Sequence, residues 1–197
     1  MSYWIVRAVA FVFLKVFFGL KVEGQENIPR KSNFIVVANH ASFLDALIIA
    51  VAIPEKIHWI AARGIYNTSW LKWIMGVSSS MPTGNSSVRA ISLLTQNKNV
   101  GVFPEGTRTH NGSLGTFRRG AALLAVKTGR PIVPCAIFGT FEALPRHAYF
   151  PKLRKLKIKI GKSKFLSKEF DETVDDIYLQ DGIFKVRNTI REMLHAG

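Results

Sequence analysis

Short apolar runs rich in β-branched residues recur along the chain, and most are followed by a polar loop and then by a helical pattern. The runs are FIVVA, IHWIAA, NVGVF and PIVPCAIFG, at residues 34–38, 57–62, 99–103 and 131–139. Runs of this length, bounded by turn residues, are typical of buried strands. Strands that alternate with helices predict an α/β fold, with a mixed, largely parallel sheet covered by helices.

The segments between these runs have the apolar spacing of helices. The helix over 43–52 is expected to stop before Pro54, and Gly129 suits a C-cap ahead of Pro131. Helices are predicted over residues 43–52, 68–76, 86–96, 118–129 and 183–195.

The end of the chain differs in character from its centre. The last part of residues 152–160 alternates lysine with apolar side chains, which predicts a strand with Lys155, Lys157 and Lys159 on one face. That face suits either contact with an anionic surface or an edge strand protected by lysines. Residues 165–182 are acidic and are expected to be irregular.

Positive charge dominates the composition of the 197-residue chain. It has 27 Lys and Arg against 13 Asp and Glu, a net charge of +14. Such a field attracts nucleic acid, anionic lipid, phosphorylated substrates or acidic carrier proteins. Cys135, the single cysteine, excludes a disulfide framework and is expected to pack in the core, and no Cys/His spacing fits structural zinc.

The N-terminus is apolar but interrupted by charge. Its longest uninterrupted apolar run in residues 3–20 is 7 residues, whereas a span needs roughly 20. Arg7, Lys15 and Lys21 fall within an arc of about 120° of a helix. We expect residues 1–22 to form an interfacial membrane helix whose basic side chains reach lipid phosphates, followed by one domain over 23–197. A buried core helix and a tilted spanning or signal segment are the alternatives.

Histidine and aspartate stand together in the loop after the first buried run, NHASFLD. A continuous helix would place His40 and Asp45 about 140° apart. If His40 instead precedes the helix, its ring can fold back to meet Asp45, which would fix the imidazole tautomer and strengthen the free nitrogen as a base. The competing interpretation is a capping box, in which Asp45 only satisfies a backbone donor near Ser42.

A second polar loop, FPEGTR, follows the run at 99–103. Glu, Gly, Thr and Arg in four successive positions suit recognition of a phosphate and a hydroxyl, since Arg108 can hold phosphate oxygens bidentately and Gly106 allows close approach. Arg118 and Arg119 add two charges at the start of a helix. The alternative is a surface loop with a salt-bridged arginine.

The HX4D pattern, followed by FPEGTR, resembles the glycerolipid acyltransferase family, and within it the 1-acylglycerol-3-phosphate (lysophosphatidate) acyltransferases. The segment FRRGAALLAVKTGRPIVPCAI is similar to that family's basic-Gly-Ala helix and its Val-Pro motif, here Val133-Pro134. The resemblance covers roughly residues 30–140.

The resemblance implies roles for both loops. His40 would be the general base that deprotonates the hydroxyl of a lysophospholipid, and Asp45 would orient it. The hydroxyl would attack an acyl thioester directly, without an acyl-enzyme. In the second loop, Glu105 would help to position the acceptor, while Arg108 binds its phosphate and Gly106 and Thr107 shape the loop.

One departure from the family pattern concerns the acceptor. The family's second block usually ends with an arginine that contributes to phosphate binding, and Gly84 stands there instead. Arg63, Arg118 and Arg119 are the candidates to replace it. The alternative acceptors are another lysophospholipid, glycerol 3-phosphate or an aminoacyl lysolipid.

The resemblance also implies partners and location. The product would be phosphatidate, the co-substrate acyl-CoA or acyl carrier protein, and no cofactor or metal is expected. The enzyme would lie peripherally on the cytoplasmic face of the cell membrane, bound to anionic lipids. A non-catalytic basic protein that binds lipid or nucleic acid is the alternative, but exposed aromatics interleaved with the basic residues, as in single-strand binders, are lacking. We therefore expect no nucleic-acid partner.

Overall fold

The computed structural model describes residues 3–61, 81–82, 86–166 and 176–197. A seven-stranded sheet in the order β1-β7-β6-β2-β5-β3-β4 forms its centre. Neighbouring strands are parallel except for β6 and β7, which are antiparallel. The strands are β1 (Lys21–Glu23), β2 (Ile35–Ala38), β3 (Ile57–Ala61), β4 (Met81–Pro82), β5 (Asn99–Val102), β6 (Ile132–Phe138) and β7 (Lys157–Ile160).

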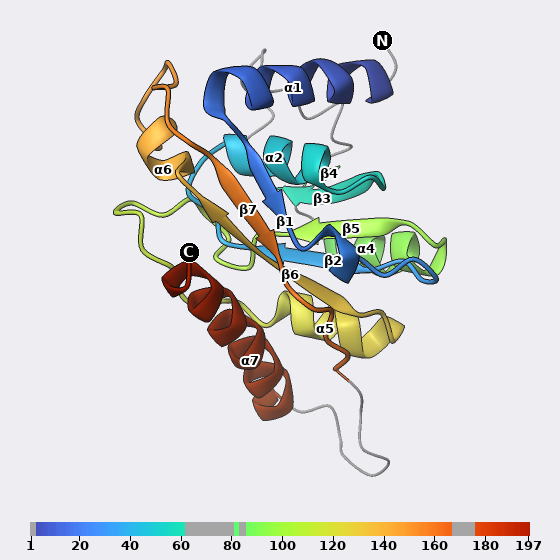
Figure 1. Cartoon of the computed structure of the whole chain (residues 1–197). Coiled ribbons are helices and arrows are strands. Elements are labelled where there is room, and N and C mark those ends of the chain that lie inside the picture. Colours follow the sequence, from blue (N-terminus) through green and yellow to red (C-terminus); the bar gives the residue numbers. More distant parts are fainter. Residues whose placement is uncertain (1–2, 62–80, 83–85, 167–175) are drawn as a thin grey trace.

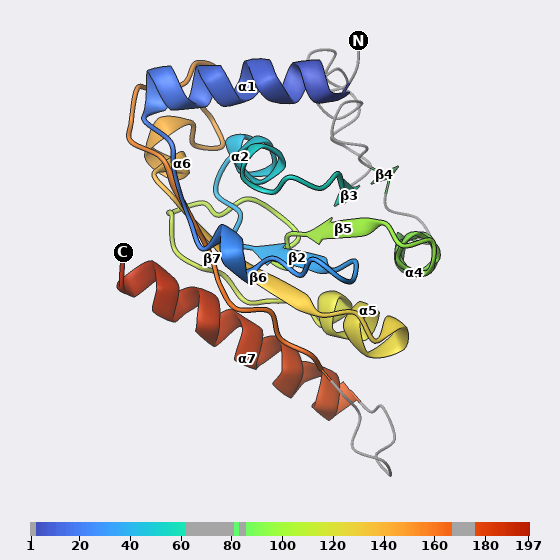
Figure 2. The same ribbon diagram turned by 45° about the vertical axis from the view of Figure 1, so that its right-hand side comes forward.

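Helices cover both faces of this sheet (Figures 1 and 2). On one face lie α1 (Tyr3–Phe18) and α2 (Leu44–Ala52), and on the other lie α4 (Ser86–Thr95), α5 (Gly120–Thr128) and α7 (Asp176–His195). A 3-10 turn, η1 (Gln25–Asn27), and the one-turn helix α6 (Thr140–Ala143) complete the described elements. The predicted fold class, a mixed and largely parallel sheet covered by helices, is confirmed.

Burial on both faces explains why the sequence of the central strand β2 is continuously apolar. Val36 and Ala38 belong to the core cluster shared with α1 and α2. Ile35 and Val37 belong to the cluster shared with α4, α5 and α7. Because each face of a covered parallel sheet is buried, every side chain of such a strand has to be apolar.

Most predicted elements are present within one or two residues of the expected bounds, and α5 ends at Gly129 in the left-handed conformation, as predicted. The strand expected over 152–160 is shorter, because β7 begins only at Lys157. The helix expected over 68–76 lies outside the described residues. The expectation of irregular structure up to residue 182 is wrong, because α7 already begins at Asp176. Leu179, Ile183 and Val186 form a buried stripe along this helix, which packs against β6 and α5.

The structure contradicts one interpretation of the lysine-rich strand, that of an edge strand. β7 is not an edge strand, because the three-residue strand β1 pairs with it on the outer side. Its lysines are used within the protein: Lys157 Nζ donates to the carbonyl of Gly197, 3.2 Å away, and Lys159 Nζ donates to that of Ala196, 3.3 Å away. These lysines therefore bind carbonyls next to the carboxyl end of α7, where a helix attracts cations.

The N-terminal helix α1 packs on the domain through one stripe. Val6, Ala10, Leu14 and Phe18 are buried, and the last three join the core cluster that contains α2. Most of the other side chains of the helix are large, apolar and exposed: Trp4, Ile5, Val9, Phe11, Val12, Phe13, Val16 and Phe17. No helix among the described residues is long and apolar enough to cross a bilayer.

One basic residue of this helix, Arg7, does not reach outward as expected. Arg7 donates from Nε to the carbonyl of Ala50 at 2.8 Å and from Nη2 to that of Val51 at 3.1 Å. These carbonyls lie at the end of α2, where they have no partner within the helix. Lys15 Nζ donates to the carbonyl of Leu20, and α1 ends before Lys21. The expectation that Arg7 contacts lipid phosphates is therefore wrong.

Candidate active site

The two polar loops meet at one edge of the sheet. Strands β2 and β5 are parallel neighbours, with Val37 opposite Val102. The chain leaves β2 for the α2 layer and leaves β5 for the α5 layer, so the two connections diverge. Ligands of open α/β sheets bind at such a switch point, outside the carboxyl ends of the strands.

His40 and Asp45 are in contact, as the sequence pattern predicts. His40 lies in the turn between β2 and α2, and its Nδ1 is 2.9 Å from Oδ2 of Asp45. The same Oδ2 accepts the backbone N–H of Ala41 at 2.7 Å and of Ser42 at 2.8 Å. Orientation of the histidine and capping of the turn are therefore performed by one fully buried carboxylate.

This contact determines which nitrogen of His40 faces a ligand. With Nδ1 against a carboxylate, we assign the proton to Nδ1, which leaves the lone pair on Nε2. The ring stacks on Phe103 with centroids 4.0 Å apart, and Phe103 in turn stacks on Trp59 at 4.6 Å. The sequence placed Phe103 and Trp59 only in buried strands, so their stacking beside His40 was not predicted.

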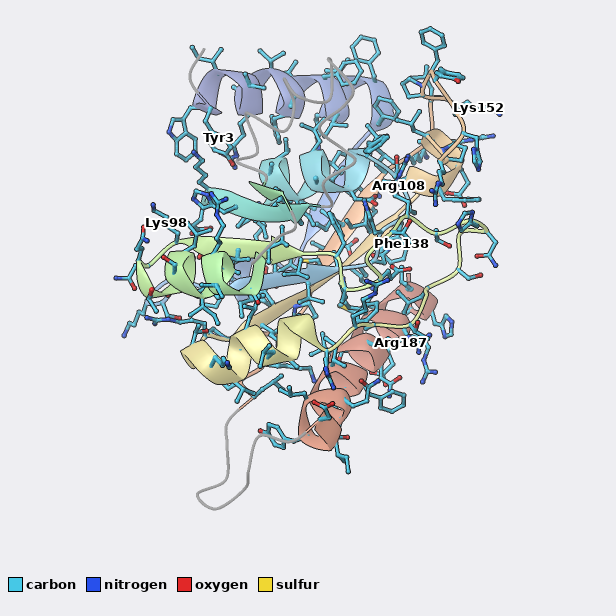
Figure 3. All side chains as sticks on the ribbon, turned by 180° about the vertical axis from the view of Figure 1, so that it is seen from behind. Tyr3, Lys98, Arg108, Phe138, Lys152 and Arg187 are labelled. Carbon is cyan, nitrogen blue, oxygen red and sulfur yellow. The ribbon has the colours of Figure 1, made fainter. Side chains whose placement is uncertain are left out.

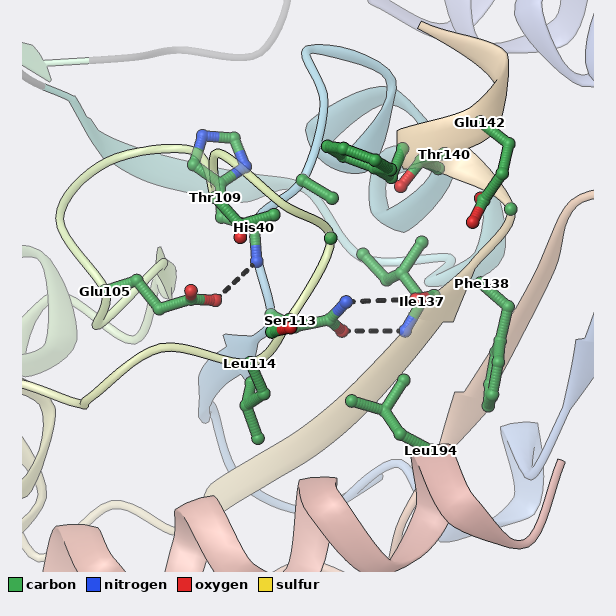
Figure 4. Close-up of a pocket in the computed structure, with 15 residues that line it drawn as sticks. His40, Glu105, Thr109, Ser113, Leu114, Ile137, Phe138, Thr140, Glu142 and Leu194 are labelled. Atoms are coloured by element: carbon green, nitrogen blue, oxygen red, sulfur yellow. Dashed lines mark hydrogen bonds between the residues drawn. The ribbon is translucent and has the colours of Figure 1, made fainter. Parts of the chain in front are cut away.

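Glu105 connects the two loops rather than pointing into open space (Figure 4). Its Oε1 accepts the backbone N–H of His40 at 2.8 Å, and its Oε2 accepts that of Gly115 at 3.0 Å. Burial raises the pKa of this carboxyl above its ordinary value, against the two backbone hydrogen bonds, which lower it. Glu105 therefore holds the backbone that carries His40.

The raised pKa of Glu105 gives a pH-dependent contribution to stability. Its protonated form is favoured in the folded state, so its contribution is fully present below the unfolded pKa and is lost as pH rises through the raised folded pKa. Glu105→Gln has no such titration. Urea unfolding over a pH series is expected to show that the free energy of unfolding of wild type, minus that of Glu105→Gln, falls as pH rises. A flat difference would contradict the assignment.

Two guanidinium groups come together at the second loop. Arg108 is half-buried and lies over the ring of Phe43, 3.6 Å from its centroid. Burial is the main cause that lowers the pKa of Arg108, and the charge of Arg146 lowers it further. Arg146 donates to Oγ1 of Thr107 and to Nε2 of His110, both at 3.2 Å. In the described part of the chain, no acidic group forms an ion pair with either arginine.

Arg146 was missed at the level of sequence. It follows the strand at 131–139, whose carboxyl end lies beside that of β2. The carboxyl ends of parallel strands share one edge of the sheet. The position of Arg146 soon after such a strand was therefore the sequence feature that could have identified it as a site residue.

The remaining candidates differ in placement. Gly106 has φ +75°, and a Cβ there would lie 3.1 Å from the guanidinium of Arg118, so this arginine packs directly on the loop. Arg119 instead forms an ion pair with Asp176 of α7. Arg63 and Gly84 lie outside the described residues.

A small cavity of about 170 Å³ adjoins this site (Figure 4). It lies between the loops and the end of β6, and its lining includes Asn39, His40, Glu105 and Thr140. Asn39 forms its wall by bonding both backbone groups of Ile137, at 3.0 and 2.8 Å. Among the residues described, no group of His, Cys, Asp and Glu is arranged to hold a metal ion.

The fold and the site define an α/β domain that places a carboxylate-oriented histidine beside two arginines suited to an anion. Comparison with known proteins identifies the family to which this domain belongs. Residues 19–138 match the Acyltransferase family. The chain belongs to this family.

Individual proteins that the chain resembles are consistent with this family. The chain is 30% identical over 152 residues to a chloroplastic 1-acyl-sn-glycerol-3-phosphate acyltransferase of Arabidopsis thaliana, covering 73% of this chain and 42% of that protein. It is 32% identical over 135 residues to the Bacillus subtilis 1-acyl-sn-glycerol-3-phosphate acyltransferase, covering 65% and 67%. The chain thus spans less than half the length of the plant relative.

A solved structure shares the fold. The crystal structure of the 1-acyl-sn-glycerophosphate (LPA) acyltransferase PlsC from Thermotoga maritima superposes with a TM-score of 0.75 at 27% identity. The match covers 97% of this chain and 80% of that one.

Proposed function

We propose that this protein is a membrane-associated O-acyltransferase. It transfers a fatty acyl chain from a thioester donor to the sn-2 hydroxyl of 1-acylglycerol-3-phosphate and produces phosphatidate. The observation that carries the proposal is the His40–Asp45 pair, 2.9 Å apart, on the same sheet edge as Arg108 and Arg146. The names of the relatives support the same reaction.

The mechanism needs one base and good positioning. Nε2 of His40 removes the proton of the acceptor hydroxyl as its oxygen attacks the thioester carbonyl. The tetrahedral intermediate then collapses, the C–S bond breaks, and the imidazolium returns its proton to the departing thiolate. Asp45 stabilises the imidazolium, and the arginines bind the acceptor phosphate. Because thioesters are already activated, these effects suffice for large acceleration.

Transfer proceeds without an acyl-enzyme. Near the site, the hydroxyl of Ser42 donates to the carbonyl of Leu144 at 2.8 Å and accepts the N–H of Leu44 at 3.2 Å. Cys135 is fully buried, and burial raises the pKa of its thiol to about 12. Neither side chain is available as a nucleophile.

The exposed apolar face of α1 suits the interface of a bilayer. With acyl-CoA or acyl carrier protein as donor, the enzyme acts on the cytoplasmic face, where both donors occur. No cofactor or metal is required for the reaction.

The test is acyl transfer by the purified chain in micelles that contain anionic lipid. Lysophosphatidate is offered with acyl-CoA or with acyl carrier protein, and phosphatidate is quantified by mass spectrometry. We expect phosphatidate with at least one donor, and lower kcat/KM with lysophosphatidylglycerol. Preferred use of the latter acceptor would overturn the acceptor assignment, and no product with any lysolipid would overturn the proposed reaction.

A further inference from the structure

A second exposed apolar group lies in the connection between α6 and β7. In the loop of residues 147–155, Tyr149 is 92% exposed, Phe150 is 84% exposed and Leu153 is 68% exposed. Large apolar side chains gathered in one short loop are unusual on a water-facing surface.

This loop is held in place by backbone hydrogen bonds at both ends. At its start, the N–H of Ala148 donates to Pro145 O, and in its middle the N–H of Lys152 donates to Ala143 O at 2.7 Å. Just after its end, the N–H of Leu156 donates at 3.1 Å to the carbonyl of Phe18, the last residue of α1. The loop is therefore tied to the carboxyl end of α1, and its tip is presented outward.

The loop and α1 lie at the same side of the molecule. Figures 1 and 2 show the connection between α6 and β7 rising beside the carboxyl end of α1, away from the α7 layer. Figure 3 places Lys152 at the level of α1, with Arg108 on the same side below it. The exposed face of α1 and the loop tip thus form one surface, which we call the docking surface.

Most of the charges of the docking surface come from the loop, with Lys15 added from α1. Lys152, Arg154 and Lys155 are exposed between and after its apolar residues, and no Asp or Glu occurs in residues 143–168. By contrast, Arg7 of α1 is turned into the protein, onto the end of α2. An apolar helix beside a loop of aromatics and cations complements an anionic bilayer, in which rings sit at headgroup level and lysines reach phosphates.

We propose that the loop of residues 147–155 is a second membrane-docking element, which inserts Tyr149, Phe150 and Leu153 into an anionic bilayer beside α1. This inference rests on the proposed function, since it brings Arg108 and Arg146 to the depth at which an amphiphilic acceptor carries its phosphate. The loop does place exposed aromatics beside basic residues, so the expectation from sequence that such residues are lacking is wrong. A bilayer still fits better than a nucleic acid, because the adjoining face of α1 is aliphatic and aromatic and carries no exposed cation other than Lys15 in its described part.

The chain permits a direct measurement of insertion. Its only cysteine, Cys135, is fully buried with a raised thiol pKa, so an environment-sensitive NBD dye attaches selectively to Phe150→Cys. The control is Gln180→Cys, exposed on α7 in the opposite layer. On vesicles of phosphatidylcholine with phosphatidylglycerol, we expect a blue shift and quenching by doxyl lipids at position 150 but not at 180. Bound protein with an unchanged spectrum at 150 would overturn the proposal.

A second arm measures the contribution to binding. The triple variant Tyr149→Ser, Phe150→Ser and Leu153→Ser is expected to bind these vesicles at least about tenfold more weakly, since three apolar side chains lose their burial. Its turnover on lysophosphatidate in detergent micelles should match wild type, which separates docking from chemistry. Unchanged vesicle affinity would contradict the insertion of this loop into the bilayer. Absence of product from wild type would contradict only the proposed reaction.

Discussion

His40→Ala is expected to lower kcat for acyl transfer by roughly 10²- to 10⁴-fold, the usual contribution of a positioned general base. Nδ1 of His40 is committed to Asp45, and Phe103 fixes the plane of the ring, so Nε2 has one direction in which to act. Alanine keeps the backbone N–H that Glu105 accepts, so the loops should stay joined. Loss of activity would then report lost chemistry.

The measurement is steady-state formation of phosphatidate by wild type and variant, with thermal unfolding to check the fold. Asp45→Asn is the companion variant: it keeps the shape of the side chain but removes the charge that stabilises an imidazolium. We expect a smaller loss in kcat for this change, accompanied by lower stability, because Oδ2 accepts three donors in a fully buried position. If His40→Ala retained a tenth of the wild-type kcat, another group would have to be the base.

The part of the site that sequence could predict consists of residues close together along the chain. His40 and Asp45 meet within one turn, so local geometry allowed their contact to be foreseen. The strands of the sheet were equally accessible, because burial on both faces demands a continuous apolar run such as that of β2.

What sequence could not predict depends on long-range partners. β1 has three residues and no pattern of its own, so the placement of β7 inside the sheet was hidden. The spacing of Arg7 and the lysines along the sequence fits the polar face of an interfacial helix. Arg7 turns inward only because the carbonyls at the end of α2 lie within its reach. Glu105 was assigned to the acceptor through resemblance, whereas its two backbone partners come from different loops.

Arg146→Ala and Arg108→Ala are each expected to raise KM for lysophosphatidate by roughly 10- to 100-fold, the range of one charge-assisted hydrogen-bonding group. The expected loss of affinity follows from the unfavourable proximity of two guanidiniums, one of them half-buried. The charge of Asp45 partly offsets it at Arg108, but in the described part of the chain neither arginine has an ion-pair partner. A phosphate monoester carries enough negative charge to neutralise both, whereas a phosphodiester carries a single charge. The acceptor itself would therefore complete this site.

Acceptor discrimination is the sharpest readout of this pair. With Arg146→Ala, the ratio of kcat/KM for lysophosphatidate to that for lysophosphatidylglycerol should fall towards unity, because the second charge of the monoester loses its partner. Arg108→Lys should fall between wild type and Arg108→Ala, since lysine keeps the charge but not the bidentate geometry. Arg191→Ala, exposed on α7, is the matched control and should leave KM unchanged. A preserved ratio in Arg146→Ala would mean that Arg108 alone reads the phosphate and that Arg146 only shapes the loop through Thr107.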